Sequence, residues 1–205
     1  MSFTIGILKE SKNPPDKRVA FTPEQCSNIQ KLFPGSTVIV QQSNIRAFSD
    51  QEYRDKGLQL KEDVSEADVL FGVKEVKIDE LIPNKCYFFF SHTIKKQSYN
   101  RELLRAVLKN NIQLVDYECL KDSKGNRLVG FGRYAGIVGA YNAFLTYGKR
   151  TASYKLKLAN QCRDKKEMLT EFSKIKLPAN FKLVLTGTGR VAKGAMEVLE
   201  QLPIS

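Results

Sequence analysis

The sequence predicts an α/β fold in which mainly parallel strands alternate with helices in a doubly wound layer, followed by the start of a second domain. Two apolar runs, residues 69–73 and 86–90, are rich in Val and Phe and flank a helix-forming segment. Unbroken runs of this length are typical of strands buried on both faces of a parallel sheet. The strand, helix, strand order then recurs along the chain, which favours a doubly wound arrangement.

Local signals place the elements of this layer. The expected strands are apolar runs bounded by polar loops, and they cover residues 3–8, 36–42, 69–73, 86–90 and 113–117. The expected helices have capping residues or apolar side chains at helical spacing, and they cover residues 23–33, 48–53, 98–109 and 134–147. The clearest helix start lies at Thr22, which together with Pro23 and Gln25 supplies an N-cap, a first-turn proline and a capping box.

The composition is that of a globular protein. The chain has 205 residues, is 42% hydrophobic and 27% charged, and carries a net charge of +11. Because the lysines are spread over the whole length and no known module accompanies them, we expect no nucleic-acid binding. No window is long and apolar enough for a membrane span, and the four cysteines form neither a C-x-x-C nor a Cys/His cluster. We therefore expect a cytoplasmic protein without a metal site.

A glycine turn near the C-terminus has the pattern G-x-G-x-x-A. It lies between an expected strand, residues 181–186, and an expected helix, residues 193–202. In this context the amides of the turn and the helix N-terminus hold the pyrophosphate of a dinucleotide. The expected cofactor-binding residues are Gly187, Thr188, Gly189, Arg190 and Val191.

These patterns divide the chain into three segments. We expect residues 1–133 to form a substrate-binding and catalytic domain, and residues 134–180 a helix and connection between domains. Residues 181–205 would form the first strand, turn and helix of a dinucleotide-binding (Rossmann) domain. One such unit cannot bury both its faces alone, so we interpret the chain as an N-terminal fragment of a longer enzyme. The alternative is that this last unit adds to the first layer.

Two titratable residues close the central apolar runs. Lys74 ends the first run, and His92, the only histidine of the chain, ends the second. Since ligands bind beyond the carboxyl ends of parallel strands, we expect both side chains in one crevice, where they would carry acid–base chemistry. The competing interpretations are a lysine that extends to solvent and a histidine in the core. Arg18, in the loop after the first strand, is either a third crevice residue or a surface arginine.

Longer motifs carry a family resemblance. They are K-E at residues 9–10 followed by R-V-A-F-T-P at residues 18–23, G-V-K-E at 72–75, F-S-H-x-x-K-x-Q at 90–97 and F-G-x-Y-A-G at 131–136. With these motifs the sequence resembles the lysine-forming, NAD-dependent saccharopine dehydrogenases, within the alanine dehydrogenase and transhydrogenase group. The resemblance covers almost the whole chain. It implies a flavodoxin-like catalytic domain of the dehydrogenase type and a nicotinamide cofactor, with NAD expected and NADP left open.

The resemblance also implies roles for individual residues. Lys74 would deprotonate the secondary amine of saccharopine as hydride leaves to NAD. His92 would manage the addition of water to the imine and its collapse to lysine and 2-oxoglutarate. Arg18 and Arg127 would hold substrate carboxylates, with Gln97 nearby as a third substrate-binding residue. Glu75 and Glu118 would adjust the charge of the pair.

Other functions fit the same sequence. An alanine dehydrogenase-like enzyme would use the same lysine, histidine and arginine positions on a smaller amino acid. A non-catalytic homologue would keep the fold and bind a ligand without reacting. In each case the expected partner is a small amino acid or 2-oxo acid, and the oligomeric state is not predicted.

Overall fold

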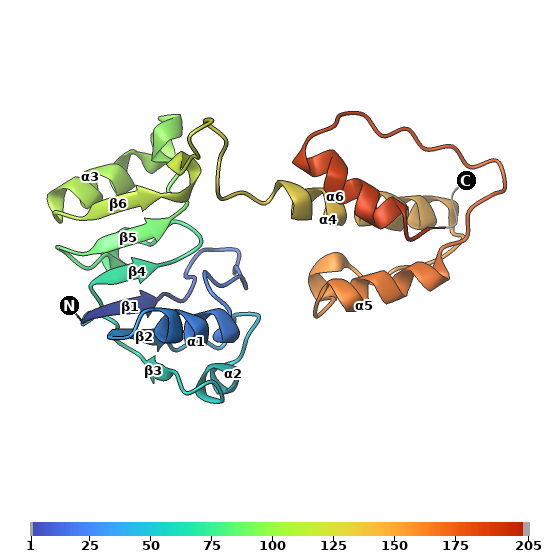
Figure 1. Ribbon diagram of the computed structural model, residues 1–205. Coiled ribbons are helices and arrows are strands. Elements are labelled where there is room, and N and C mark those ends of the chain that lie inside the picture. The colour runs from blue at the N-terminus through green and yellow to red at the C-terminus, as the bar shows by residue number, and fades with distance from the viewer. Residues whose placement is uncertain (1, 203–205) are drawn as a thin grey trace. The chain divides into compact units, whose positions relative to one another are not determined.

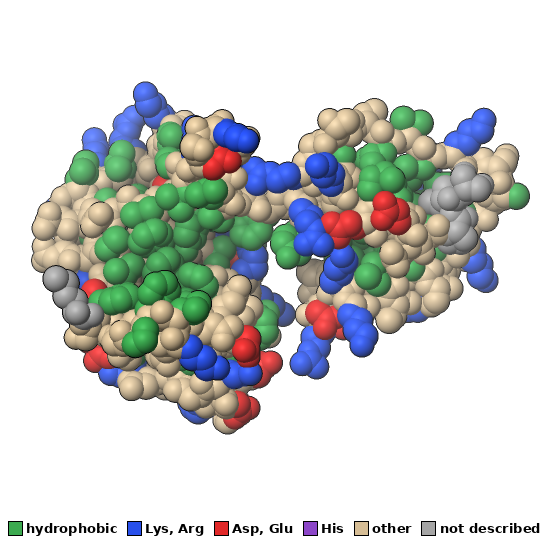
Figure 2. All heavy atoms as spheres, in the orientation of Figure 1, with side chains coloured by type: hydrophobic (Ala, Val, Ile, Leu, Met, Phe, Trp, Pro, Cys, Tyr) green, Lys and Arg blue, Asp and Glu red, His purple; other side chains and the backbone are tan. Residues whose placement is uncertain are grey.

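The computed structural model describes residues 2–202 and divides into two compact units. The first unit comprises Met1–Gly130 and the second Phe131–Ser205. Each unit has an apolar core of its own and is considered by itself (Figure 1). Basic side chains are scattered over the visible surface of each unit rather than gathered in one patch (Figure 2).

The first unit is built on a parallel sheet with the strand order β3-β2-β1-β4-β5-β6. Its strands are β1 Phe3–Ile7, β2 Ser36–Gln41, β3 Gln59–Lys61, β4 Val69–Phe71, β5 Cys86–Phe89 and β6 Gln113–Asp116. The order reverses between β1 and β4, which pair in parallel from Ile5 with Val69 to Ile7 with Phe71. Such a reversal is the position where doubly wound folds bind ligands. The predicted fold class is confirmed.

Short helices connect these strands and cover the sheet. They are α1 Pro23–Leu32, α2 Asp50–Arg54 and α3 Arg101–Lys109. The predicted capping box at Thr22 is present, since its side chain accepts from the Gln25 amide and the Gln25 side chain accepts from the Thr22 amide. Between β4 and β5, where a helical segment is predicted, there is a single 3-10 turn, Ile78–Glu80. β3 is not predicted from the sequence, because three residues of mixed polarity form no apolar run.

Two apolar clusters lie on opposite faces of the sheet. Val38 and Val40 of β2 pack with Cys26 of α1 and Tyr53 of α2. Ile39, between those valines, belongs to the cluster that contains residues of β4, β5 and α3. Because neighbouring residues of a strand point to opposite faces, α1 and α2 cover one face and α3 covers the other. Full burial of each such Val or Ile side chain stabilises the fold by about 1.5–3 kcal/mol.

The second unit is helical in the part that the structure describes. It contains α4 Gly132–Thr151, α5 Lys165–Thr170 and α6 Arg190–Leu199. The helices α4 and α6 touch through glycines: a Cβ atom on Gly136 would lie 1.9 Å from the carbonyl oxygen of Val191, and one on Gly194 would lie 1.9 Å from that of Arg133. The two backbones are therefore in direct contact, and α4 shares one apolar cluster with α6.

The strand predicted for residues 181–186 is wrong for this structure. These residues are irregular, and Val184 within them is 87% exposed. A strand needs a neighbour to receive its backbone hydrogen bonds, and the described part of the second unit contains no other strand with which the segment could pair. The helix after the glycine turn is present, and it starts at Arg190, a few residues earlier than predicted.

Candidate active site at the carboxyl ends of β4, β5 and β6

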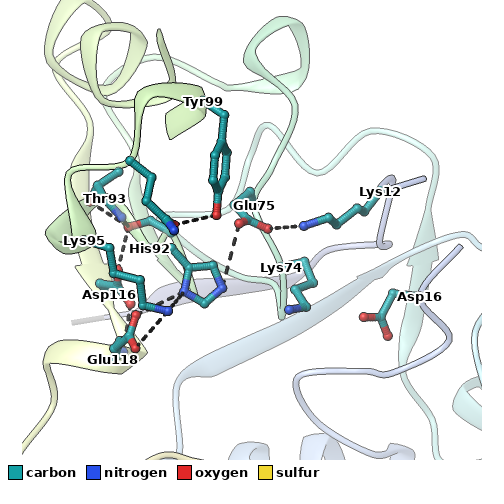
Figure 3. A network of polar contacts seen from close by, with 12 residues as sticks. Lys12, Asp16, Lys74, Glu75, His92, Thr93, Lys95, Tyr99, Asp116 and Glu118 are labelled. Atoms are coloured by element: carbon teal, nitrogen blue, oxygen red, sulfur yellow. Dashed lines mark hydrogen bonds and ion pairs between the residues drawn. The ribbon is translucent and has the colours of Figure 1, made fainter. Parts of the chain in front are cut away.

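The candidate site is formed where three neighbouring parallel strands end. β4 pairs with β5, Phe71 opposite Phe88, and β5 pairs with β6, Phe89 opposite Asp116. Lys74 and Glu75 follow β4, His92 follows β5, and Glu118 follows β6. The prediction that the strands preceding Lys74 and His92 are neighbours is confirmed, and both side chains lie in the polar network of Figure 3.

His92 lies between two carboxylates. Its Nδ1 atom is 3.0 Å from Oε2 of Glu118, and its Nε2 atom is 3.8 Å from Oε1 of Glu75. Lys95 Nζ is a further contact, 3.1 Å from the same Nδ1. The His92 side chain is 20% exposed, and its backbone has a left-handed φ of 57°. A histidine with charged neighbours on both ring nitrogens is not packed in an apolar core, so that competing interpretation does not describe this structure.

The carboxylates beside His92 are held in their ionised form. The hydrogen bond with His92 is the main cause that keeps the pKa of Glu118 below its usual value, and Lys95 and Arg127 add to the effect. Burial acts to raise the pKa of Glu75, but hydrogen bonds from its own backbone amide and from Lys12 outweigh burial and leave that pKa lowered. Lys12 Nζ lies 3.0 Å from Oε2 of Glu75. His92 thus lies between two ionised carboxylates.

The backbone of Lys74 is fixed by Glu10, which is not among the predicted site residues. The Lys74 amide donates to Oε2 of Glu10 at 2.9 Å, and the Val73 amide donates to Oε1 at 2.7 Å. In Figure 3 the Lys74 side chain lies between His92 and Asp16. Its positive charge contributes to lowering the pKa of Asp16, although the hydrogen bond from Arg18 is the main cause.

The three predicted substrate-binding residues lie on different loops of the first unit. Arg18 follows β1 and donates from Nε to Oδ1 of Asp16 at 2.9 Å. Arg127 NH1 lies 3.3 Å from Oε1 of Glu118, which ties it to the network around His92. Gln97 is exposed and accepts a hydrogen bond from the hydroxyl of Tyr99 at 2.8 Å. Both arginines thus already contact protein carboxylates, and a substrate carboxylate would compete with those contacts.

Five further polar residues of this region were not predicted as site residues: Glu10, Lys12, Asp16, Lys95 and Tyr99. Lys95 is the lysine of F-S-H-x-x-K-x-Q, and Glu10 is the glutamate of the K-E motif, so two of them lie in motifs that the analysis had noted. Among residues 2–202, no cluster of three or more His, Cys, Asp or Glu side chains is arranged to hold a metal ion.

The glycine turn belongs to the second unit. Gly187 has a φ of 94°, a conformation that favours glycine. Gly189 is the N-cap of α6, and as a glycine it has no side chain that could cap the helix. A Cβ atom on either glycine would meet no atom within 4 Å, so the space next to the turn is open. The first turn of a helix leaves amides without partners inside the helix, and an open N-terminus of this kind suits a phosphate group.

The fold and the site together define a class of protein: a doubly wound α/β domain with titratable residues at the carboxyl ends of its central strands. A family model described as "Alanine dehydrogenase/PNT, N-terminal domain" matches residues 6–138. The chain belongs to this family. In the described residues, no helix combines the length and apolarity that a membrane crossing requires.

Similar proteins cover the chain over almost its whole length. A mitochondrial alpha-aminoadipic semialdehyde synthase of Mus musculus is 37% identical over 216 residues, which span 97% of this chain and 23% of the relative. A saccharopine dehydrogenase (NAD(+), L-lysine-forming) of Emericella nidulans is 29% identical over 96% of this chain and 56% of the relative. A solved L-alanine dehydrogenase has a TM-score of 0.59 at 21% identity, covering 74% of this chain and 42% of that one. The chain spans about a quarter of the length of the semialdehyde synthases.

Proposed function

We propose that the chain carries the substrate-binding part of a nicotinamide-dependent oxidoreductase acting on CH–NH bonds, similar to saccharopine dehydrogenase. The reaction would convert saccharopine, NAD and water to lysine, 2-oxoglutarate and NADH. The observation that supports this most directly is the placement of Lys74 and His92 after the adjacent strands β4 and β5. The relatives named saccharopine dehydrogenase and alpha-aminoadipic semialdehyde synthase give further support.

Lys74 would act as the base of the oxidation step. An amine accepts a proton only when it is itself neutral, and it then takes the proton of the secondary amine as the adjacent C–H bond loses hydride. The amide of Lys74 is fixed by a buried carboxylate, so the start of its side chain is held in one direction. Placement of this kind lowers the entropic part of the barrier.

His92 would act in the hydrolytic steps. As a base it would take a proton from the water that adds to the imine carbon, and as an acid it would return a proton to the departing amine. Glu118 and Glu75 on either side would hold the imidazole ring in one orientation during these transfers. Lys95, which also contacts Glu118 at 3.3 Å, would share that carboxylate with His92.

Arg18, Gln97 and Arg127 would bind the carboxylates of the substrate. The guanidinium group matches a carboxylate with two parallel hydrogen bonds, and the side chains of Arg18 and Arg127 are 42% and 39% exposed. Asp16 and Glu118 would hold these arginines in place before substrate arrives. The hydrogen bond from Tyr99 occupies the amide oxygen of Gln97, so the amide NH2 group is the end suited to donate to a carboxylate.

The glycine turn fits a dinucleotide. Gly187, Thr188, Gly189, Arg190 and Val191 would hold its pyrophosphate with backbone amides at the N-terminus of α6, where open space adjoins both glycines. Bound nicotinamide would accept the hydride that the substrate carbon loses. NAD is the form that we propose, in line with the name of the saccharopine dehydrogenase relatives.

The assay that tests this function uses the full-length enzyme that contains this chain. We expect NADH oxidation with 2-oxoglutarate plus lysine, and little or none with pyruvate plus ammonia. Activity with pyruvate and ammonia alone would replace the proposal with an alanine dehydrogenase-like reaction. Binding of saccharopine without turnover under either condition would indicate a non-catalytic homologue.

A further inference from the structure

Glu10 is a buried carboxylate at the point where β1 leaves the sheet. Its residue exposure is 8%. Both of its oxygens are occupied by backbone amides of the neighbouring chain segment, Oε1 by Val73 at 2.7 Å and Oε2 by Lys74 at 2.9 Å. The carboxylate thus extends the contact between β1 and β4 beyond their last strand pair, Ile7 with Phe71.

The peptide that Glu10 holds is also bound from the other side. The Val73 carbonyl accepts from the amide of Phe90 at 3.1 Å, and Phe90 lies two positions before His92. Val73 therefore connects Glu10 with the segment after β5. This one peptide therefore fixes the position of the Lys74 backbone relative to the segment that carries His92.

Glu10 is coupled to the loop after β1 as well. Burial raises the pKa of Glu10, while the charge of Arg18 acts in the opposite direction. The negative charge of Glu10 in turn contributes to raising the pKa of Arg18, behind the hydrogen bond with Asp16. Glu10 thus contacts the backbone of the predicted base, and it lies in the same loop, between β1 and α1, as Arg18.

The arrangement requires a carboxylate and not merely a polar side chain. Two backbone N–H groups converge on it, and each donates to an oxygen of its own, an arrangement that a carboxylate provides and an amide side chain with one oxygen does not reproduce. A glutamine would present one oxygen and one NH2 group. Its NH2 group would then face one of the two backbone N–H groups, and two donors would oppose each other. A buried amide left unsatisfied is unfavourable, because it loses its hydrogen bonds to water without gaining a protein partner.

We propose that Glu10 is a positioning residue for the candidate active site, whose carboxylate sets the direction of Lys74 at the end of β4. The inference rests on the proposed function, in which Lys74 is the base. It deepens that function by assigning a role to a residue that need not touch substrate.

The first experiment measures Lys74 directly in the 205-residue chain. Wild type, Glu10→Gln and Glu10→Asp are labelled with a limiting amount of an amine-selective reagent across a pH series, and mass spectrometry quantifies Lys74 against the exposed Lys31. In Glu10→Gln we expect the Lys74 labelling rate to change by about threefold or more, because the backbone that carries this side chain loses a hydrogen bond to a charged group. For Glu10→Asp, which keeps both carboxylate oxygens, we expect a Lys74 labelling rate between those of wild type and Glu10→Gln.

The control variant is Glu102→Gln, which removes the carboxylate of an exposed pair with Arg105. In this variant the ratio of Lys74 labelling to Lys31 labelling should equal that of wild type. A folded Glu10→Gln protein, judged by circular dichroism, that labels like wild type at every pH would overturn the proposal.

A second experiment needs no variant and covers the case in which Glu10→Gln does not fold. Amide shifts of Val73 and Lys74 are followed by NMR in wild type as the pH is lowered. Both amides should move with one shared midpoint above the usual glutamate range, because they share one buried carboxylate with a raised pKa. If the shifts of both amides show no midpoint that belongs to a carboxylate, the proposal is overturned.

Neither readout depends on turnover. If the proposed function is wrong, the dehydrogenase assay fails, whereas Lys74 labelling still changes when Glu10 is replaced. In the full-length enzyme, if the proposed function holds, Glu10→Gln should lower kcat by about 10²-fold, the effect of a small misplacement, with little change in KM for 2-oxoglutarate.

Discussion

The carboxylate of Glu118 lies 3.0 Å from Nδ1 of His92 and 3.3 Å from Nζ of Lys95, so one side chain after β6 binds two residues of the segment after β5. Arg127 reaches the same carboxylate at 3.3 Å. This carboxylate connects three segments of the candidate site, and the first prediction concerns its charge.

Replacing Glu118 by Gln should destabilise the first unit in a pH-dependent way. The folded-state pKa of Glu118 is lowered, chiefly by His92. Its stabilising contribution is therefore full above the unfolded-state pKa of about 4.3, and it is lost as the pH falls through the lower folded-state value. Urea unfolding at pH 7 and at several values below pH 4 should show a difference from wild type that shrinks with acidity. The exposed-pair variant Glu102→Gln is the control, and a difference that stays constant with pH would contradict the assignment.

Lys74→Met should abolish most turnover without unfolding the chain. The Lys74 side chain is partly exposed, so the change costs little packing, whereas loss of a general base lowers kcat by about 10²–10⁴-fold. The measurement is NADH formation from saccharopine by the full-length enzyme, with circular dichroism as the folding check. Lys77→Met, in the exposed part of the next loop, is the matched control. Unchanged turnover in Lys74→Met would remove this lysine from the mechanism.

Arg18→Lys should weaken the binding of a substrate carboxylate. Lysine keeps the charge but loses the planar pair of donors, and losing one charged hydrogen bond raises KM for 2-oxoglutarate by about tenfold or more. Steady-state kinetics on the full-length enzyme check this, with Arg105→Lys in the exposed pair with Glu102 as the control. Equal KM values for both variants would return Arg18 to the role of a surface arginine.

The contact between α4 and α6 should fail when its glycines gain a methyl group. In Gly136→Ala or Gly194→Ala, the new Cβ would lie 1.9 Å from a backbone carbonyl oxygen. Backbone atoms cannot yield as a flexible side chain does, so we expect a loss of about 1–3 kcal/mol or more. Gly139→Ala in the same helix meets no atom within 4 Å, and it should be neutral or stabilising by up to about 1 kcal/mol. Thermal unfolding of the three variants tests this, and equal melting temperatures would refute the close contact.

Local chemistry explains why much of the fold could be predicted. The strands before Lys74 and His92 are recognisable because a run such as residues 86–90 is apolar without interruption, and α1 because Thr22 and Gln25 complete a capping box. β3 was missed because residues 59–61 have no apolar run, and their strand conformation depends on pairing with β2. The predicted strand at 181–186 has the right apolar residues, but the described part of the second unit contains no other strand with which it could pair.

The sequence by itself determined which side chains end the central strands, because hydrophobic runs and the residues that close them are local properties. Lys74, His92 and Glu118 were assigned to strand ends on that basis. Only the tertiary structure decided which partners these residues have. The contacts of Glu118 with His92 and of Glu10 with Lys74 join residues far apart in the chain. Such contacts depend on strand order and register, and in a doubly wound sheet these are fixed when the separate βα units pack together.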